Sequence, residues 1–139
     1  MSTHFKEKEE KLEQILERLT EEAEKGTPIT VEGRKDVETL TALGIKGRII
    51  SAKSGGKSLL DVVSEIKDTG ACEVVLLLDF DRRGKELTAR LKQLLEHDGI
   101  KSNTVLWAEL FALVGKEVKD VEGLASYMET LKRKLSGNS

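Results

Sequence analysis

Residue types that build many catalytic and metal sites are scarce in this sequence. Its 139 residues include one cysteine, Cys72, and two histidines, His4 and His97. A single thiol excludes an internal disulfide bond and a zinc site built on several thiolates. Two histidines give little support to a Ser-His-Asp triad or to a histidine-rich metal site. Hard oxygen ligands remain, and Cys72, just before an apolar segment, is expected to pack in the core.

Long apolar runs are also missing. No run approaches the roughly 20 residues that a membrane helix needs, and the charged N-terminus does not resemble a signal peptide. Hydrophobic residues make up 38% of the chain and charged residues 35%, which is typical of a globular protein. We therefore expect a single cytoplasmic domain with no membrane partner.

A large excess of charge of one sign is absent as well. The formal net charge is −2, which taken alone argues against a polyanionic partner. The charges are unevenly distributed, because residues 6–25 carry eight acidic and five basic side chains, a net charge of −3. The rest of the chain therefore carries +1, and many of its basic residues follow predicted strands.

The hydrophobic spacing predicts alternating strands and helices. The predicted strands are 29–31, 45–51, 73–78 and 103–106, and the predicted helices are 3–25, 36–43, 58–68, 83–96, 109–114 and 121–135. The continuous apolar run in 73–78 is typical of a central strand covered on both faces. This order indicates an α/β fold of three layers, a mainly parallel four-stranded sheet with flanking helices.

We expect these elements to form one domain around a core at 27–106. An amphipathic N-terminal helix, 1–26, packs on the core, helices within 107–135 complete it, and a disordered tail follows at 136–139. Ligands bind at the carboxyl ends of the strands in such sheets. The residues after each strand are therefore the candidates for function.

Carboxylates follow two of the predicted strands. Glu32 and Gly33 come after the first strand, and Asp79 and Asp81 come after the third. Gly33 lets the backbone turn sharply, and two aspartates two residues apart share a face in extended geometry. Three neighbouring carboxylates repel one another unless a cation neutralises them, which favours a divalent metal site. The alternative is that Asp81 caps the following helix and Glu32 faces solvent.

Basic residues follow the same strands. They are Arg34 and Lys35, then Lys53 and Lys57, and then Arg82, Arg83 and Lys85. Cations around a metal-bearing crevice suit the phosphates of a nucleic acid, although solvated loop charge is the alternative. The segment 54–58 has the glycines and lysine of a phosphate-binding loop, but Ser51 stands where that loop needs a glycine. A nucleotide triphosphatase is therefore not expected, but the loop could still bind one phosphate through backbone N–H groups at the start of the following helix. A nucleotide-binding module that uses Lys57 is the least supported alternative.

These residues resemble the Toprim signature of topoisomerases, bacterial-type primases and rRNA maturases. That signature has Glu-Gly after the first strand and Asp-x-Asp-x-x-Gly after a later one, here Glu32-Gly33 and Asp79 to Gly84. The resemblance covers about 27–106 and is greatest to small stand-alone archaeal Toprim proteins. It implies that Glu32 is a general acid or base and a metal ligand, that Asp79 and Asp81 bind Mg²⁺, and that Asp36 supports them.

The resemblance does not extend to every activity of the family. A topoisomerase needs a nucleophilic tyrosine on another domain, and the only tyrosine here, Tyr127, is expected to pack. Trp107 and Phe111 are likewise expected in the core rather than against bases, and Glu122 either caps the final helix or joins an outer metal shell. The expected function is Mg²⁺-dependent phosphodiester cleavage of RNA or DNA. The alternative is a non-catalytic nucleic-acid-binding or assembly module that works with a partner protein.

Overall fold

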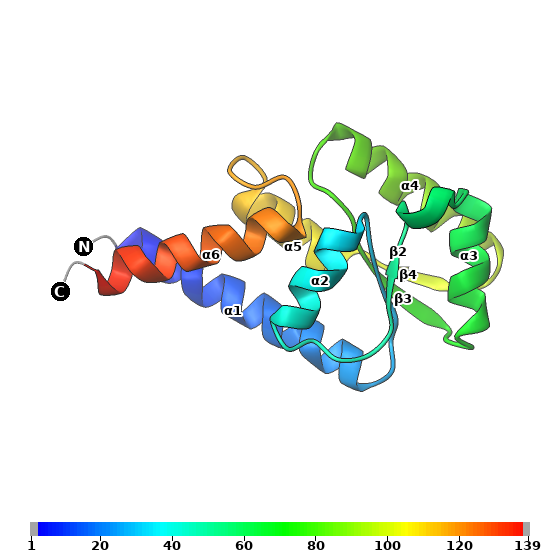
Figure 1. Cartoon of the computed structure of the whole chain (residues 1–139), viewed down its shortest axis with the longest axis horizontal. Helices are drawn as coiled ribbons and strands as arrows, with labels where there is room; N and C mark the ends of the chain where they lie inside the picture. The colour runs from blue at the N-terminus through cyan, green and yellow to red at the C-terminus, as the bar shows by residue number, and fades with distance from the viewer. Residues whose placement is uncertain (1–2, 138–139) are drawn as a thin grey trace.

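The computed structural model describes residues 3–137, which form six α-helices, a short 3₁₀ turn and a four-stranded sheet (Figure 1). The strands are β1 (Ile29–Val31), β2 (Ile49–Ser51), β3 (Glu73–Leu77) and β4 (Lys101–Asn103). The helices are α1 (Thr3–Glu24), α2 (Arg34–Ala42), α3 (Leu59–Asp68), α4 (Arg82–His97), α5 (Val105–Val114) and α6 (Val121–Ser136), with η1 (Ser54–Gly56) before α3. Within the described residues, no helix combines the length and apolar character that crossing a membrane requires.

The sheet is entirely parallel, in the order β2-β1-β3-β4. β1 lies between β2 and β3, so that Val31 is opposite Ser51 on one side and Leu77 on the other. The carboxyl ends of the four strands therefore lie at one edge of the sheet. Glu32 and Asp79, which follow two adjacent strands, both lie at this edge.

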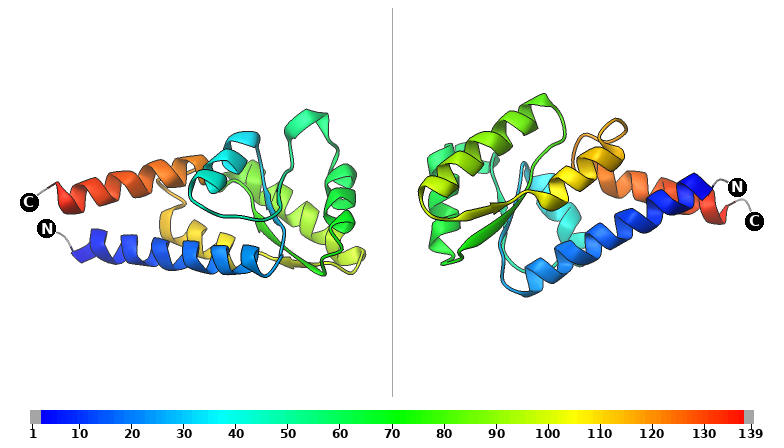
Figure 2. Two further views of the ribbon diagram at one scale, coloured as in Figure 1. Left: turned by 60° about the horizontal axis from the view of Figure 1, so that its bottom comes forward. Right: turned by 180° about the vertical axis from the view of Figure 1, so that it is seen from behind.

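Helices cover both faces of the sheet and complete the predicted three layers (Figure 2). Alternation along β3 explains the arrangement, because successive side chains of a strand point to opposite faces. Val75 and Leu77 pack with α1, α2, α5 and α6, whereas Val74 and Leu76 pack with α3 and α4. The predicted α/β fold is confirmed, and both hydrophobic faces of the central strand are buried.

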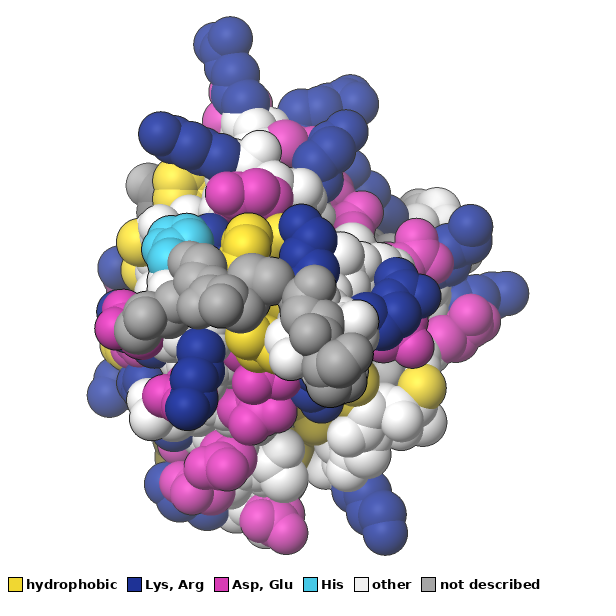
Figure 3. Space-filling model, turned by 90° about the vertical axis from the view of Figure 1, so that its left-hand side faces the viewer, with side chains coloured by type: hydrophobic (Ala, Val, Ile, Leu, Met, Phe, Trp, Pro, Cys, Tyr) yellow, Lys and Arg dark blue, Asp and Glu magenta, His cyan; other side chains and the backbone are white. Residues whose placement is uncertain are grey.

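α1 and α6 lie side by side and extend beyond the sheet, with the two termini at the same end (Figures 1 and 2). Leu12, Ile15 and Leu19 of α1 are buried there, as their helical spacing predicts. Seen from this end, positive and negative side chains are interspersed (Figure 3). Of the tail predicted to be disordered, Ser136 ends α6 and Gly137 follows it, and residues 138–139 lie outside the described part of the chain.

Four local predictions are wrong. The fourth strand is Lys101–Asn103 rather than 103–106, and α5 begins at Val105 rather than at Glu109. Leu106, Leu110 and Val114 are buried at four-residue spacing, which is typical of a helix. The run at 103–106 is too short to distinguish this spacing from a strand. β2 begins at Ile49 rather than at 45, because its partner β1 begins opposite at Ile29. Cys72 is exposed rather than packed, since it precedes the first buried residue of β3.

Candidate functional site

Glu32 lies just beyond β1 with its side chain buried. One carboxylate oxygen, Oε2, accepts a hydrogen bond from Nζ of Lys53 at 2.8 Å, and the other, Oε1, accepts from the backbone N–H of Asp79 at 3.2 Å. The side chain of Glu32 is 8% exposed and that of Lys53 is 53% exposed. Its neighbours therefore come from the ends of the two strands that flank β1.

Asp79 lies beside Glu32 at the end of β3. Burial, the nearby carboxylates of Glu32, Asp36 and Asp120, and a hydrogen bond with Glu32 raise the pKa of Asp79 to about 7. Each of these carboxylates disfavours ionisation of the others. Near neutral pH, the cluster is therefore poised to exchange a proton for a metal ion.

Asp36, in the first turn of α2, is buried and belongs to the same cluster. Its Oδ2 accepts a hydrogen bond from the N–H of Gly33 at 3.1 Å, and its Oδ1 accepts from the N–H of Glu122 at 3.1 Å. Burial raises the pKa of Asp36 although these two hydrogen bonds lower it. Asp36, which was predicted to support the metal ligands, thus connects the start of α2 to the start of α6.

Asp120 is a further carboxylate that the sequence reasoning missed. It is the N-cap of α6, where Oδ1 accepts from the N–H of Gly123 at 2.7 Å. A backbone hydrogen bond from Phe80 N–H to the carbonyl of Lys119, at 2.6 Å, joins its loop to the turn after β3. The spacing Asp120 to Gly123 indicates a helix cap, but only the tertiary contact reveals the carboxylate cluster. Glu122, by contrast, is exposed and joins the site through its backbone.

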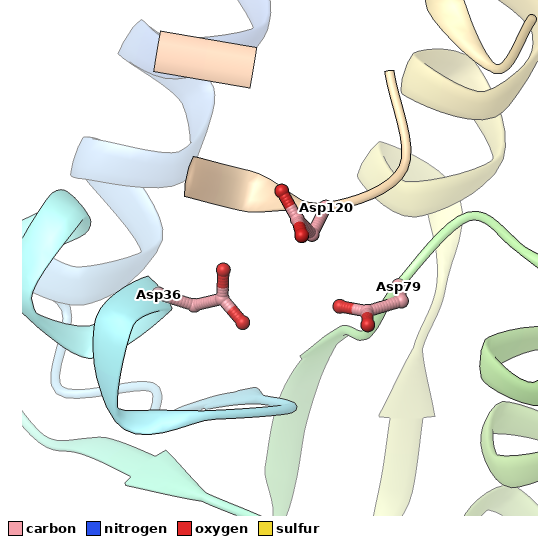
Figure 4. A group of neighbouring side chains, drawn as sticks. All are labelled: Asp36, Asp79 and Asp120. Atoms are coloured by element: carbon pink, nitrogen blue, oxygen red, sulfur yellow. The ribbon is translucent and has the colours of Figure 1, made fainter. Parts of the chain in front are cut away.

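The carboxylates of Asp36, Asp79 and Asp120 face a common space between α2, β3 and α6 (Figure 4). One oxygen from each lies within 4.8 Å of the other two. Adjacent ligands of an octahedral Mg²⁺ ion are about 3 Å apart and opposite ligands about 4 Å apart, so the three oxygens would have to move closer together to bind one ion. The all-oxygen donor set and the raised pKa values of Asp36 and Asp79 fit a hard divalent cation.

Asp81 lies apart from this three-carboxylate cluster. β3 ends at Leu77, and Asp81 is the N-cap of α4, where its Oδ1 accepts from the N–H of Gly84 at 2.8 Å. The prediction that the two motif aspartates lie on one extended strand is therefore wrong. The capping alternative is present in the structure, and metal binding by Asp81 stays a prediction.

The two motif glycines differ in what the fold requires of them. A Cβ on Gly84 would overlap the backbone carbonyl of Asp79, so only glycine lets α4 start this close to the end of β3. Gly33 has an extended backbone with φ −130°, which any residue adopts, and a Cβ there would meet only Asp36 Oδ2 at 3.8 Å. The chain does bend at Glu32 and Gly33, as predicted, but the backbone of this bend does not require glycine.

The basic residues predicted to bind phosphate fall into two groups. Lys57 is held internally, because its Nζ donates to the carbonyl of Ser51 and to Glu65, both at 2.7 Å. Lys53 binds Glu32, as described above. Four others are exposed near the amino ends of α2 and α4: Arg34, Lys35, Arg82 and Arg83. Arg82 pairs with Glu86 at 3.3 Å, and Lys85 lies over the Phe111 ring at 4.3 Å from its centroid.

Aromatic residues support the site from behind. Trp107 donates from its ring nitrogen to the carbonyl of Leu78 at 2.8 Å and stacks on Phe111 with ring centroids 5.6 Å apart. Both rings pack against the core on the α1 side of the sheet, and so does Tyr127. The predictions that these residues pack are confirmed, and the Trp107 contact fixes the backbone that precedes Asp79.

Known proteins similar to this chain share its fold and its small size. The profile of the Toprim domain family matches residues 27–110. A UPF0292 protein of Methanocaldococcus jannaschii is 41% identical over 120 residues, which cover 86% of this chain and 91% of the relative. A UPF0292 protein of Methanosarcina acetivorans is 35% identical over 130 residues, which cover 94% and 88%. A solved structure from Aquifex aeolicus has a TM-score of 0.68 at 24% identity, covering 80% of this chain and 95% of that one, a likeness of fold alone.

Proposed function

Because this chain belongs to the Toprim domain family, we propose that it binds Mg²⁺ and cleaves phosphodiester bonds in RNA or DNA. The observation that carries the proposal is the convergence of carboxylates at the carboxyl edge of the sheet: Glu32, Asp36, Asp79 and Asp120. Toprim domains typically bind Mg²⁺, and this edge is where α/β proteins bind ligands. The alignments with two archaeal relatives cover most of both chains, and the proposed site lies within the aligned Toprim domain.

The proposed metal ligands are Asp79 with Asp36 and Asp120. The family motif also implies Glu32 and Asp81, and Asp81, which caps α4, is proposed to contribute least. Asp79 is the member best suited to ionise on metal binding, because the raised pKa of its carboxyl group holds a proton near neutral pH. Bound Mg²⁺ supplies positive charge that stabilises the negative charge developing on a phosphoryl oxygen. Mg²⁺ sites commonly use only one or two carboxylates and retain several waters, so the cluster has more carboxylates than a Mg²⁺ site needs.

Glu32 is the proposed general acid or base. Its buried carboxylate is held from two sides, by the N–H of Asp79 and the ammonium of Lys53. A general base must lie within hydrogen-bond reach of the proton that it removes from the attacking group. Lys53 is exposed, so a substrate phosphate could replace Glu32 as its partner. Exchange would free Oε2 to accept a proton as the substrate arrives.

The basic residues of this edge are proposed to hold the substrate phosphates. Arg34 and Lys35 begin α2, Arg82 and Arg83 begin α4, and all four are exposed. Arginine binds phosphate oxygens through two donors at once, which positions a phosphodiester as well as attracting it. Lys57 would need to leave both Ser51 and Glu65 to take part, so its contribution is proposed to be the smallest.

The test is cleavage of labelled structured RNA, single-stranded DNA and duplex DNA in Mg²⁺ or EDTA. We expect cleavage only with Mg²⁺, and a loss of about 100-fold or more in Glu32→Gln and Asp79→Asn. Asp68→Asn is the matched control, because it removes one exposed carboxylate at the last residue of α3. Cleavage that persists in both site variants would contradict the proposed roles. Binding without cleavage of any substrate would favour the non-catalytic module that works with a partner protein.

A further inference from the structure

A shallow basic depression lies on the α4 side of the carboxylate edge. It is lined by Lys53, Arg83, Glu86, Leu87 and Arg90. Lys53 comes from the loop after β2, and the other four residues recur on one face of α4 at helical spacing. The depression therefore joins the loop that contacts Glu32 to the exposed surface of a helix.

The two arginines of the depression are available to a ligand, whereas Lys53 is paired with Glu32. Glu86, the one acid that lines it, pairs with Arg82 at 3.3 Å. Within residues 3–137, neither Arg83 nor Arg90 has a carboxylate within salt-bridge distance. Two arginines without acidic partners are suited to binding an anion, because the guanidinium group cannot lose its charge near neutral pH.

The charge of α4 distinguishes it from the long helix on the opposite face of the sheet. α4 carries five lysines and arginines against two glutamates, whereas α1 carries four against eight glutamates. A polyanion approaching the carboxylate edge is therefore attracted along α4 and repelled along α1. The unequal charge of the two helices favours approach of a polyanion along α4. The overall net charge of −2 does not reveal this difference.

The position of α4 connects this surface to the site. Its N-cap, Asp81, is two residues after Asp79, so the helix starts at the carboxylate edge and runs away from it. Arg83 lies in the first turn, and Arg90 lies two turns farther along, a separation of about 10 Å. That separation is roughly the axial advance of three phosphates along one strand of a duplex.

We infer that a nucleic-acid strand lies along α4, with its phosphates bound in turn by Arg90, Arg83 and Lys53 as it approaches Glu32. The inference rests on the proposed function, because it assigns a path to the substrate of the same site. Lys53 is the residue shared by the path and the site, since it lines the depression and binds Glu32. Arg90 is an addition to the basic residues that the sequence singled out.

The test compares two double variants that remove equal charge at equal spacing. Arg83→Ala with Arg90→Ala removes the pair on α4, and Lys11→Ala with Arg18→Ala removes a pair seven residues apart on α1. Lys11 and Arg18 also line a surface depression, and Arg18 differs from the α4 arginines in pairing with Glu109 at 2.7 Å. Binding of fluorescein-labelled single-stranded DNA, its RNA counterpart and the duplex is measured by anisotropy in EDTA, between about 50 and 200 mM salt.

We expect the α4 double variant to bind roughly tenfold more weakly and to lower the slope of log affinity against log salt by about two. The α1 double variant should keep both the wild-type affinity and the wild-type slope. Equal changes in the two variants, no change in the α4 variant, or no binding by the wild-type protein would overturn the inference. Thermal unfolding of both variants excludes a general loss of folding.

The measurement separates this inference from the proposed cleavage. It is made in EDTA, so it does not depend on metal or turnover. Mg²⁺-dependent cleavage by the wild-type protein with unchanged binding by the α4 variant would overturn the path and leave the activity. A weakened, less salt-dependent α4 variant without cleavage by any protein would support the path and count against the nuclease.

Discussion

The carboxyl edge of the sheet has two halves of opposite character. The half next to α2 and α6 collects carboxylates: Asp36, Asp79 and Asp120. The half next to α4 collects cations, with Lys53 and Arg83 at the edge and Arg90 two turns farther along α4. Glu32 lies on the boundary, because its carboxylate is bound by Asp79 N–H on one side and by the Lys53 ammonium on the other. The first half suits a metal cation and the second a phosphate, so under the proposed function a substrate that contacts both would have its reacting bond near Glu32.

The acidic half also differs from acidic residues elsewhere in the molecule. Hydrogen bonds from the backbone N–H and hydroxyl of Ser58 lower the pKa of Asp61, a first-turn residue of α3 that is fully exposed. Burial and neighbouring carboxylates instead raise the pKa of Asp79. The ionised form of an aspartate is therefore stabilised at Asp61 and destabilised at Asp79. Burial and neighbouring carboxylates, rather than position at a helix start, distinguish Asp79 from Asp61.

The largest expected effect tests which carboxylates belong to the acidic half. Asp120→Asn should weaken Mg²⁺ binding by about 10- to 100-fold, because it removes a charged oxygen from the cluster. Asp81→Asn is the matched change and should alter the affinity by less than about threefold, since asparagine also caps helices well. Isothermal titration with Mg²⁺ measures both affinities. An equal loss in Asp81→Asn would make Asp81 as strong a metal ligand as Asp120 and extend the acidic half to the start of α4.

The second prediction concerns the glycines that border the two halves. Gly84→Ala should lower the free energy of unfolding by about 1–3 kcal/mol, because its Cβ would overlap the carbonyl of Asp79. Gly33→Ala should be neutral or slightly stabilising, by less than about 1 kcal/mol, because its backbone is already extended. Urea unfolding of both variants measures the difference. Equal destabilisation by the two substitutions would mean that the start of α2 is as tightly packed as the start of α4.

Much of the fold could be predicted from local sequence patterns. β1 and the final helix were located closely because apolar periodicity and capping residues mark them. The fourth strand was misplaced because a run of four residues, 103–106, suits a strand or a helix equally well. Pairing with β3, which places Lys101 opposite Glu73, decides the position and is a property of the whole sheet.

The site was predictable to the extent that its residues directly follow strands. Glu32 and Asp79 meet because β1 and β3 are adjacent, which the alternating pattern allows one to expect. Asp120 could not be found in this way, because a hydrogen bond between Phe80 and Lys119 brings its loop to the edge. The internal partners of Lys57 were equally hidden, since a lysine in a glycine-rich loop has the same sequence whether it binds a phosphate or Ser51.

The smallest expected effect is on stability and tests the crowding of the acidic half. The pKa of Asp79 is raised from its ordinary value to about 7, so the folded state retains a proton that the unfolded state loses at lower pH. Stability in EDTA should therefore fall as pH rises from about 4 to 7, by about 1–2 kcal/mol for this partly buried side chain. Asp61 does not oppose this trend, because its lowered pKa places its own effect below that range.

The variant that isolates this effect is Asp79→Asn, which cannot ionise. Its unfolding free energy in EDTA should change less than that of the wild type between pH 5 and pH 8, measured by urea titration at about half-unit steps. Mg²⁺ should recover wild-type stability at pH 8 by binding the folded state, and should do so much less in the variant. The same decline in both proteins would show that Asp79 is not the titrating group. In that case, the cations in the half next to α4 would neutralise the carboxylate cluster more fully than their position beside Glu32 indicates.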